Sequence, residues 1–156
     1  YKYEEVKMTT LFDLRKINQN DKNEFMTMSR DFYNSDAVSA PVPENFHEQA
    51  FSDLMAGTPY AECLFFTHGN QVAGFALLAK TYSREAGGEC VWVEELYLKP
   101  EFRGMGAAKT FFGKLSALYP AARYRLEVEP DNERAKKLYR ACGFTSLPYE
   151  QMKKGF

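Results

Sequence analysis

The segment 96–109 reads Leu96-Tyr97-Leu98-Lys99-Pro100-Glu101-Phe102-Arg103-Gly104-Met105-Gly106-Ala107-Ala108-Lys109. It runs from an apolar strand through a tight basic turn into an amphipathic helix. Amide groups at a helix start have no partner within the helix and carry the positive end of its dipole. Gly104 and Gly106 have no side chains, so an anion can approach the backbone closely, and Arg103 adds a guanidinium. The segment therefore predicts a site for a phosphate-bearing molecule.

Two common phosphate-binding loops do not fit this segment. A P-loop that ends in Lys109-Thr110 requires glycine where Arg103 and Ala108 stand, which disfavours nucleoside-triphosphate chemistry. A dinucleotide-binding loop that starts at Gly104 requires a third glycine at the position of Lys109, and it normally follows the first strand of its domain. The expected ligand therefore belongs to another class of phosphate compound.

The turn does contain the pattern Arg/Gln-x-x-Gly-x-Gly/Ala, at Arg103, Gly106 and Ala108. This pattern resembles the acyl-CoA pyrophosphate loop of the GNAT superfamily of N-acyltransferases. The second half of the chain carries further residues in the superfamily's order after a strand, namely Asn132, Ala135, Tyr139, Gly143 and Phe144. The resemblance covers residues 60–156, whereas the first sixty residues fit the layout without a motif.

The resemblance implies a set of acetyl-CoA-binding residues. The backbone of Leu96, Tyr97 and Leu98 is expected to bind the pantetheine arm like an added strand. The other expected cofactor-binding residues are Arg103, Gly104, Met105, Gly106, Ala107, Ala108, Lys109, Asn132 and Ala135. A solvated helix lysine explains Lys109 equally well, and a helix cap explains Asn132.

Periodicity along the chain predicts a mixed α/β domain. Strands are expected over 10–15, 62–67, 71–82, 90–98 and 124–129, with a last pair within 144–153. Helices are expected over 21–33, with a capping box at Asp21-x-x-Glu24, over 44–56 and 106–119, and over a stretch that ends near Ala141. Their predicted buried residues are Phe25, Met28 and Phe32, then Phe46, Ala50, Phe51 and Leu54, then Ala108, Phe111, Phe112, Leu115 and Leu118. The resemblance adds the fold class, a mostly antiparallel central sheet that splays between its fourth and fifth strands, with about four helices around it.

Composition agrees with a single domain over residues 1–156. The chain is 45% hydrophobic and 15% aromatic, with a net charge of -1, so no global field attracts nucleic acid or an anionic membrane. Cys63, Cys90 and Cys142 have no C-x-x-C spacing and are expected to be reduced thiols, with no metal site. No signal peptide or long apolar run is present. A cytoplasmic location is expected, and a homodimer is one expected state because many relatives pair.

Transfer of an acetyl group to an amine needs a base, since an alkylamine with a pKa of about 10.4 is protonated at neutral pH. Glu94 and Glu95 precede the basic turn and offer carboxylates. Strand alternation sends them to opposite faces unless a bulge intervenes. The strand Glu94 to Leu98 resembles that of polyamine and small-amine acetyltransferases, which favours Glu94 as the base, with Glu95 as the fallback. The alternative for both is a solvated or ion-paired strand residue.

Departure of the CoA thiolate needs a proton donor beside the sulfur, and the resemblance assigns this role to Tyr139. Ala135, Leu138, Tyr139 and Cys142 also lie at i, i+3, i+4 and i+7, which is the spacing of a buried helix stripe. Both roles are compatible, because a tyrosine can bury its ring and leave its hydroxyl at a cavity wall.

The predicted function is transfer of acetyl from acetyl-CoA to a primary amine, by direct attack in a ternary complex. The acceptor is a small amine, a polyamine, or a lysine or N-terminal amine, and its identity stays open. Tyr82, Glu85 and the loop 36–45 are expected to shape its pocket. A non-catalytic acyl-CoA sensor is the alternative, although Tyr139 and Glu94 together favour catalysis. A nucleotide-binding protein is disfavoured by the missing glycines.

Overall fold

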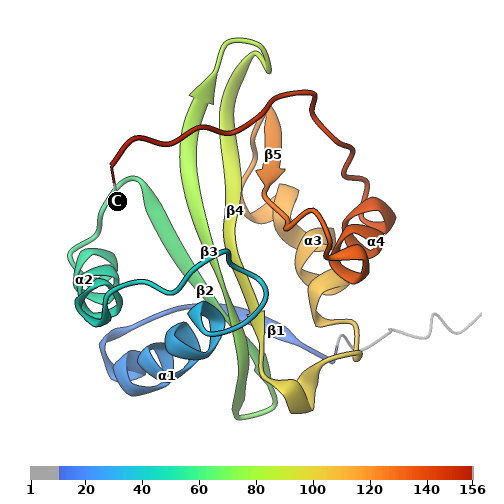
Figure 1. Ribbon diagram of the computed structural model, residues 1–156. Coiled ribbons are helices and arrows are strands. Elements are labelled where there is room, and N and C mark those ends of the chain that lie inside the picture. The colour runs from blue at the N-terminus through green and yellow to red at the C-terminus, as the bar shows by residue number, and fades with distance from the viewer. Residues whose placement is uncertain (1–10, 156) are drawn as a thin grey trace, which may run out of the picture.

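The computed structural model describes residues 11–155 of the chain. A five-stranded sheet in the order β1-β2-β3-β4-β5 lies between helices that cover its two faces (Figure 1). The strands are β1 (Asp13–Lys16), β2 (Ala61–His68), β3 (Gln71–Ser83), β4 (Gly88–Leu98) and β5 (Arg123–Leu126). The helices are α1 (Lys22–Tyr33), α2 (Glu44–Met55), α3 (Ala107–Leu118) and α4 (Glu133–Ala141), with 3-10 turns η1 (Gln19–Asp21) and η2 (Pro100–Phe102). The expected mixed α/β fold is confirmed.

The sheet divides between its last two strands. Strands β1 to β4 are antiparallel neighbours, whereas β4 and β5 are parallel and are joined through α3. Their pairing runs only from Cys90 with Arg123 to Val93 with Leu126, and β4 then continues to Leu98 with β3 as its one partner strand among the described residues. The splay between the fourth and fifth strands is therefore present, and it starts directly after Val93.

A β-bulge lies at the point where the two strands part. In the pairing of β3 with β4, Leu78 faces Val93 and Leu77 faces Glu95. Glu94 is thus an extra residue without a partner on β3, which bends the strand and increases its local twist. The bulge explains the splay, because a strand that bends away from β5 cannot continue its hydrogen-bond ladder.

Two cores lie on the two faces of the sheet. Phe66, Leu78 and Phe111 belong to the core beneath α3, and Phe25 and Phe75 belong to the core beneath α1 and α2. Each of these five side chains is at most 1% exposed. Burial of a side chain of this size stabilises the fold by roughly 1.5 to 3 kcal/mol. The two cores hold β4 rigidly on both sides just before its free end.

The start of α1 differs from the prediction. The expected capping box at Asp21 and Glu24 is absent, and Asn18 with Asp21 forms one around η1 instead. The Asp21 carboxylate also accepts two hydrogen bonds from Arg15, at 2.7 and 2.8 Å. Asp21 is therefore occupied by the tighter turn and by an ion pair with β1. Thr10, the expected first residue of β1, lies outside the described residues.

The expected strand ends also need correction. β5 stops at Leu126 rather than at Glu129, because β4 has already turned away and offers no partner. The predicted strand pair within 144–153 does not form, and Pro148 lacks the backbone donor that a ladder requires. The stretch 83–89, which lies between two expected strands, is partly strand: Ser83 belongs to β3 and residues 88–89 belong to β4, so residues 84–87 form the turn of one long hairpin.

Two predicted core residues are exposed. Phe46 on α2 is 42% exposed, and Leu118 at the end of α3 is 49% exposed. On α2 the buried positions are His47 and Phe51, and His47 Nδ1 lies 2.7 Å from Ser29 Oγ on α1. His47 thus takes the buried place expected of Phe46, while Ala50, Phe51 and Leu54 pack in the core as expected. Within residues 11–155, every helix is too short or too polar to cross a membrane.

Candidate active site

A cleft of about 680 Å³ opens where β4 and β5 separate. Its walls come from the free end of β4, the turn before α3, the start of α4 and the segment after α1. Every residue that the sequence predicted to bind acetyl-CoA lines this cleft except Met105, whose side chain is 41% exposed at the turn. The splay thus brings together residues that lie up to 39 positions apart, from Leu96 to Ala135.

The start of α3 presents bare backbone to the cleft. Gly106 caps the helix with a φ of 86°, in the left-handed region that other L-residues avoid. A Cβ placed on Gly104 or Gly106 would meet no atom within 4 Å. Ala107 and Ala108, the first residues of α3, line the cleft, and amides at a helix start can donate to an anion.

Arg103 is held at the mouth of the cleft by its own turn. Its Nε donates to the carbonyl oxygen of Leu98 at 2.9 Å, and its guanidinium carbon lies 5.7 Å from the centroid of the Tyr97 ring. Lys109 and Arg134 line the same cleft. Three cations and a helix start in one cleft are a donor set that suits a diphosphate.

The opposite wall is set by the ends of α4. The Asn132 side chain caps the helix by accepting from the Ala135 amide at 3.0 Å, so the capping interpretation of Asn132 is confirmed. At the other end, the Gly143 amide donates to Arg140 and the Phe144 amide to Tyr139, both at 3.0 Å. This is a Schellman motif, and the φ of 92° at Gly143 explains why glycine stands there.

Tyr139 combines core packing with a place on the cleft wall. Its ring lies 5.8 Å from Phe112 and 6.2 Å from Phe144, centroid to centroid. Burial raises the pKa of its hydroxyl above the usual value, and the nearby Cys142 adds to this. The group is therefore protonated at neutral pH, as a proton donor must be.

The bulge puts both glutamates on one face of the sheet. Val93 and Leu96 belong to the core beneath α3, and the two residues between them point away from it. Glu95 accepts a 2.5 Å hydrogen bond from the Tyr33 hydroxyl on α1. Opposite faces were expected for Glu94 and Glu95 unless a bulge intervened, and the extra residue at Glu94 is such a bulge.

Glu94 and Tyr139 line the same small cavity of about 50 Å³. This cavity adjoins the cleft, and both are lined by Leu96, Asn132 and Ala135 as well as Tyr139. Burial raises the pKa of the Glu94 carboxyl, and the charge of Glu127 raises it further. The predicted base and the predicted acid thus meet beyond the inner end of the cleft.

Glu95 lies in a different pocket, between the sheet, α1 and α2. Its residue exposure is 8%. Burial raises the pKa of its carboxyl to about 7, the hydrogen bond from Tyr33 opposes this, and the charge of Glu94 adds to it. Glu95 is therefore partly protonated near neutral pH, and its hydrogen bond with Tyr33 joins the bulge to α1.

The sequence interpretation missed three residues of the site. Arg134 lies beside Asn132, Glu127 faces Glu94, and Tyr33 binds Glu95. The position of Arg134 in the first turn of α4, between Asn132 and Ala135, could have indicated its place in the site. No local sequence pattern connects Tyr33 with β4. Of the expected acceptor-pocket residues, Asp36 and Ala37 do line the cleft. Tyr82, which was also expected there, does not line the cleft, and its side chain is 73% exposed.

Comparison with known proteins agrees with this geometry. The model of the acetyltransferase (GNAT) family matches residues 23–144. Thialysine N-epsilon-acetyltransferase of Bos taurus is 27% identical over 146 residues, which cover 86% of this chain and 84% of that protein. An uncharacterized N-acetyltransferase of Mycobacterium tuberculosis is 28% identical over 110 residues, which cover 69% and 67%.

Solved structures share the fold at low identity. A possible acetyltransferase from Clostridium difficile 630 superposes with a TM-score of 0.79 at 15% identity, over 94% of this chain and 99% of that chain. AAC(6')-Iy in complex with a bisubstrate analog of CoA superposes with a TM-score of 0.76 at 15% identity, over the same shares. The splayed sheet, the glycine-started helix and the family match together show that the chain belongs to the GNAT family of acetyltransferases.

Proposed function

We propose that the protein transfers the acetyl group of acetyl-CoA to the primary amine of a small molecule, in a ternary complex. The observation that supports this most is the meeting of Glu94 and Tyr139 in one cavity at the inner end of a cleft that suits a diphosphate. Thialysine N-epsilon-acetyltransferase, one of the relatives named above, acts on an amine according to its name, which agrees with the proposed reaction class.

The outer part of the cleft binds and orients the cosubstrate. The amides at the start of α3 and the Arg103 guanidinium hold the diphosphate, and the free edge of β4 from Leu96 to Leu98 lines the pantetheine arm. When bound, acetyl-CoA supplies an acetyl group activated as a thioester. Because the edge of β4 from Leu96 to Leu98 leads from the turn to the bulge, an arm bound along it places the acetyl group near the bulge.

The inner cavity carries out the proton transfers. Glu94 accepts a proton from the ammonium form of the acceptor and passes it to solvent, which leaves a neutral amine. The amine nitrogen then bonds to the acetyl carbon while the carbon–sulfur bond breaks. Tyr139 donates its proton to the departing sulfur and regains one from the nitrogen. The products are an amide, free CoA and one proton released to solvent.

The test combines binding with turnover. Isothermal titration with acetyl-CoA, CoA and ATP should show binding of the first two only, and a panel of amines should release free thiol from acetyl-CoA. Binding without thiol release over the whole panel would indicate an acyl-CoA sensor. Preference for ATP would end the acetyltransferase proposal.

Tyr139→Phe tests the acid separately. It should lower kcat by about a hundredfold to ten-thousandfold, the range of a lost general acid, and leave acetyl-CoA affinity unchanged, since the ring contacts with Phe112 and Phe144 remain. Tyr124→Phe is the matched control. The Tyr124 hydroxyl donates to the Tyr119 carbonyl oxygen over 2.8 Å, and Tyr124 does not line the cleft. This substitution should cost about 1 kcal/mol of stability and leave kcat intact. Wild-type turnover in Tyr139→Phe would leave only a packing role.

A further inference from the structure

A second, larger cavity adjoins the one that holds Glu94. Its volume is about 430 Å³, and Glu127, Val128 and Tyr139 line both cavities. The cleft lies on one side of Tyr139 and this cavity extends beyond it, with the segment 144–151 as its outer wall. If the amine of an acceptor lies at Glu94, the larger cavity therefore has room for the rest of the acceptor molecule.

The two ends of this space differ in charge. Glu94 and Glu127 lie at the reaction end, close enough for the charge of Glu127 to act on Glu94. The larger cavity is lined by Arg125, Lys136 and Arg140 in addition to Glu127. A ligand that matches both ends has a cation at the first and an anion at the second.

Arg125 is the cation of this cavity whose guanidinium forms no ion pair with a carboxylate of the described residues. Lys136 lies 2.9 Å and Arg140 4.0 Å from carboxylate oxygens of Glu133. On β5, Arg123 lies 3.5 Å from Glu85. Across residues 11–155, no carboxylate lies within 4 Å of the Arg125 guanidinium.

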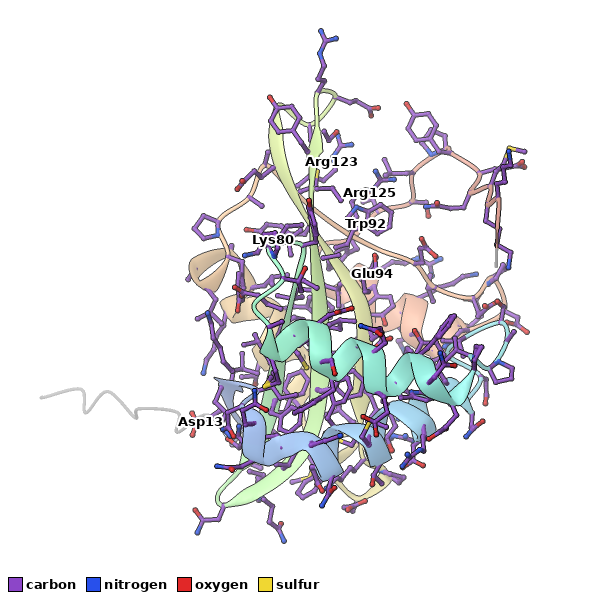
Figure 2. The ribbon with its side chains drawn as sticks, turned by 90° about the vertical axis from the view of Figure 1, so that its left-hand side faces the viewer. Asp13, Lys80, Trp92, Glu94, Arg123 and Arg125 are labelled. Atoms are coloured by element: carbon purple, nitrogen blue, oxygen red, sulfur yellow. The ribbon has the colours of Figure 1, made fainter. Side chains whose placement is uncertain are left out.

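Trp92 holds Arg125 in a defined position. The guanidinium carbon lies 4.3 Å from the centroid of the Trp92 ring, and the two residues are direct partners across β4 and β5. A guanidinium that stacks by its face keeps the donors at its edge free for a carboxylate. In Figure 2 the labelled residues Arg125, Trp92 and Glu94 follow one another down the sheet.

We infer that the acceptor is a small ω-amino acid, whose amine lies at Glu94 while its carboxylate binds Arg125. This rests on the proposed acetyl transfer. Trp92 and Glu94 are two residues apart on β4, so roughly 7 Å separates their Cα atoms along the strand. A chain of several methylene groups spans such a separation. A diamine of equal length would place its second ammonium among Arg125, Lys136 and Arg140, whose positive charges repel it.

Three acceptors of equal chain length test this inference. They are 6-aminohexanoate, its neutral amide 6-aminohexanamide, and hexane-1,6-diamine. The full chain with acetyl-CoA should show the highest kcat/KM with 6-aminohexanoate, at least tenfold above the amide, and the lowest with the diamine. Arg125→Gln should lower kcat/KM for 6-aminohexanoate by tenfold or more, mainly through KM, and change the amide by less than twofold.

The comparison between acceptors separates recognition from damage to the fold, because a structural defect would lower all three rates together. Arg84→Gln, an exposed arginine on the β3–β4 turn, is the matched control and should change none of them. Arg125→Glu should reverse the order and favour the diamine. Equal rates for the three acceptors, or an equal loss for all three in Arg125→Gln, would overturn the inference while the acetyl transfer stands. Failure to release thiol with any amine would instead overturn the proposed function.

Discussion

At the scale of single residues, two adjacent glutamates have different surroundings. Glu94 is the bulged residue and lines the cavity of Tyr139, whereas Glu95 is buried against Tyr33. Glu94→Gln should lower kcat/KM at neutral pH by about a hundredfold or more, because a general base contributes this much. The rate should recover toward higher pH, where more of the amine is neutral without help. A pH profile of thiol release measures this.

Glu95→Gln serves as the matched comparison for Glu94→Gln. Its amide can still accept from the Tyr33 hydroxyl, so the bulge keeps its brace. Turnover near the wild-type value is expected, with no shift of the profile toward higher pH. A larger loss in Glu95→Gln than in Glu94→Gln would transfer the role of base to Glu95.

The raised pKa of Glu95 also predicts a pH dependence of stability. Its carboxyl has a pKa of about 7 in the fold against 4.5 when unperturbed, so the folded state binds more protons than the unfolded state between these values. The free energy of unfolding should therefore fall by about 3 kcal/mol as pH rises through this window, and stay level above it.

Urea titrations at pH 4.5 and pH 8 measure this effect. Glu95→Gln removes the titrating group, so it should match the wild type at pH 4.5 and exceed it by up to about 3 kcal/mol at pH 8. Glu89→Gln, at an exposed position on the same strand, should follow the wild type at both pH values. Parallel curves for wild type and Glu95→Gln would contradict the prediction.

At the scale of elements, the start of α3 depends on one backbone conformation. Gly106 has a φ of 86° and borders the cleft. Gly106→Ala should cost about 1 to 2 kcal/mol of stability from the strained backbone. It should also weaken CoA binding by tenfold or more, because its methyl stands where the anion approaches.

Gly57→Ala separates these two effects. Gly57 has a φ of 79° after α2, and a Cβ there also meets no atom within 4 Å, but it does not line the cleft. The substitution should therefore cost similar stability with no change of the Kd for CoA, measured by calorimetry. Equal CoA affinity in both variants would remove the start of α3 from the binding site.

At the scale of the whole molecule, the cleft joins elements from both halves of the sheet. A ligand that binds only this folded arrangement stabilises it by about 2.7 kcal/mol at a hundred times its Kd. For a chain of this length, CoA should therefore raise Tm by about 5 to 10 °C. ATP should have little effect, and Arg103→Glu should abolish the shift. A thermal scan that shows no shift with CoA in the wild type would contradict a preformed site.

Most features that depend on neighbouring residues were predictable from the sequence, and the capping box expected at Asp21 and Glu24 is the exception. The turn around Arg103, the start of α3, the cap at Asn132 and the turn at Gly143 each follow from a short motif, and each is present. The placement of side chains that depends on contacts between distant segments was not predictable from the sequence. The relation of Glu94 to Glu95 depends on a pairing shift with Leu77, and no local pattern reveals it.

Local chemistry was enough for the order of the elements as far as α4 and for the glycine-started helix after β4, and the resemblance of short motifs was enough for the family. Glycine, proline and helix-capping side chains act on the backbone within a few residues, so their effects can be read from the chain. The shared face of the two glutamates, the pairing of Tyr33 with Glu95 and the cavity that holds Arg125 above Trp92 were decided only in three dimensions. They depend on strand register and on packing between segments far apart in the chain, which hydrophobic periodicity does not encode.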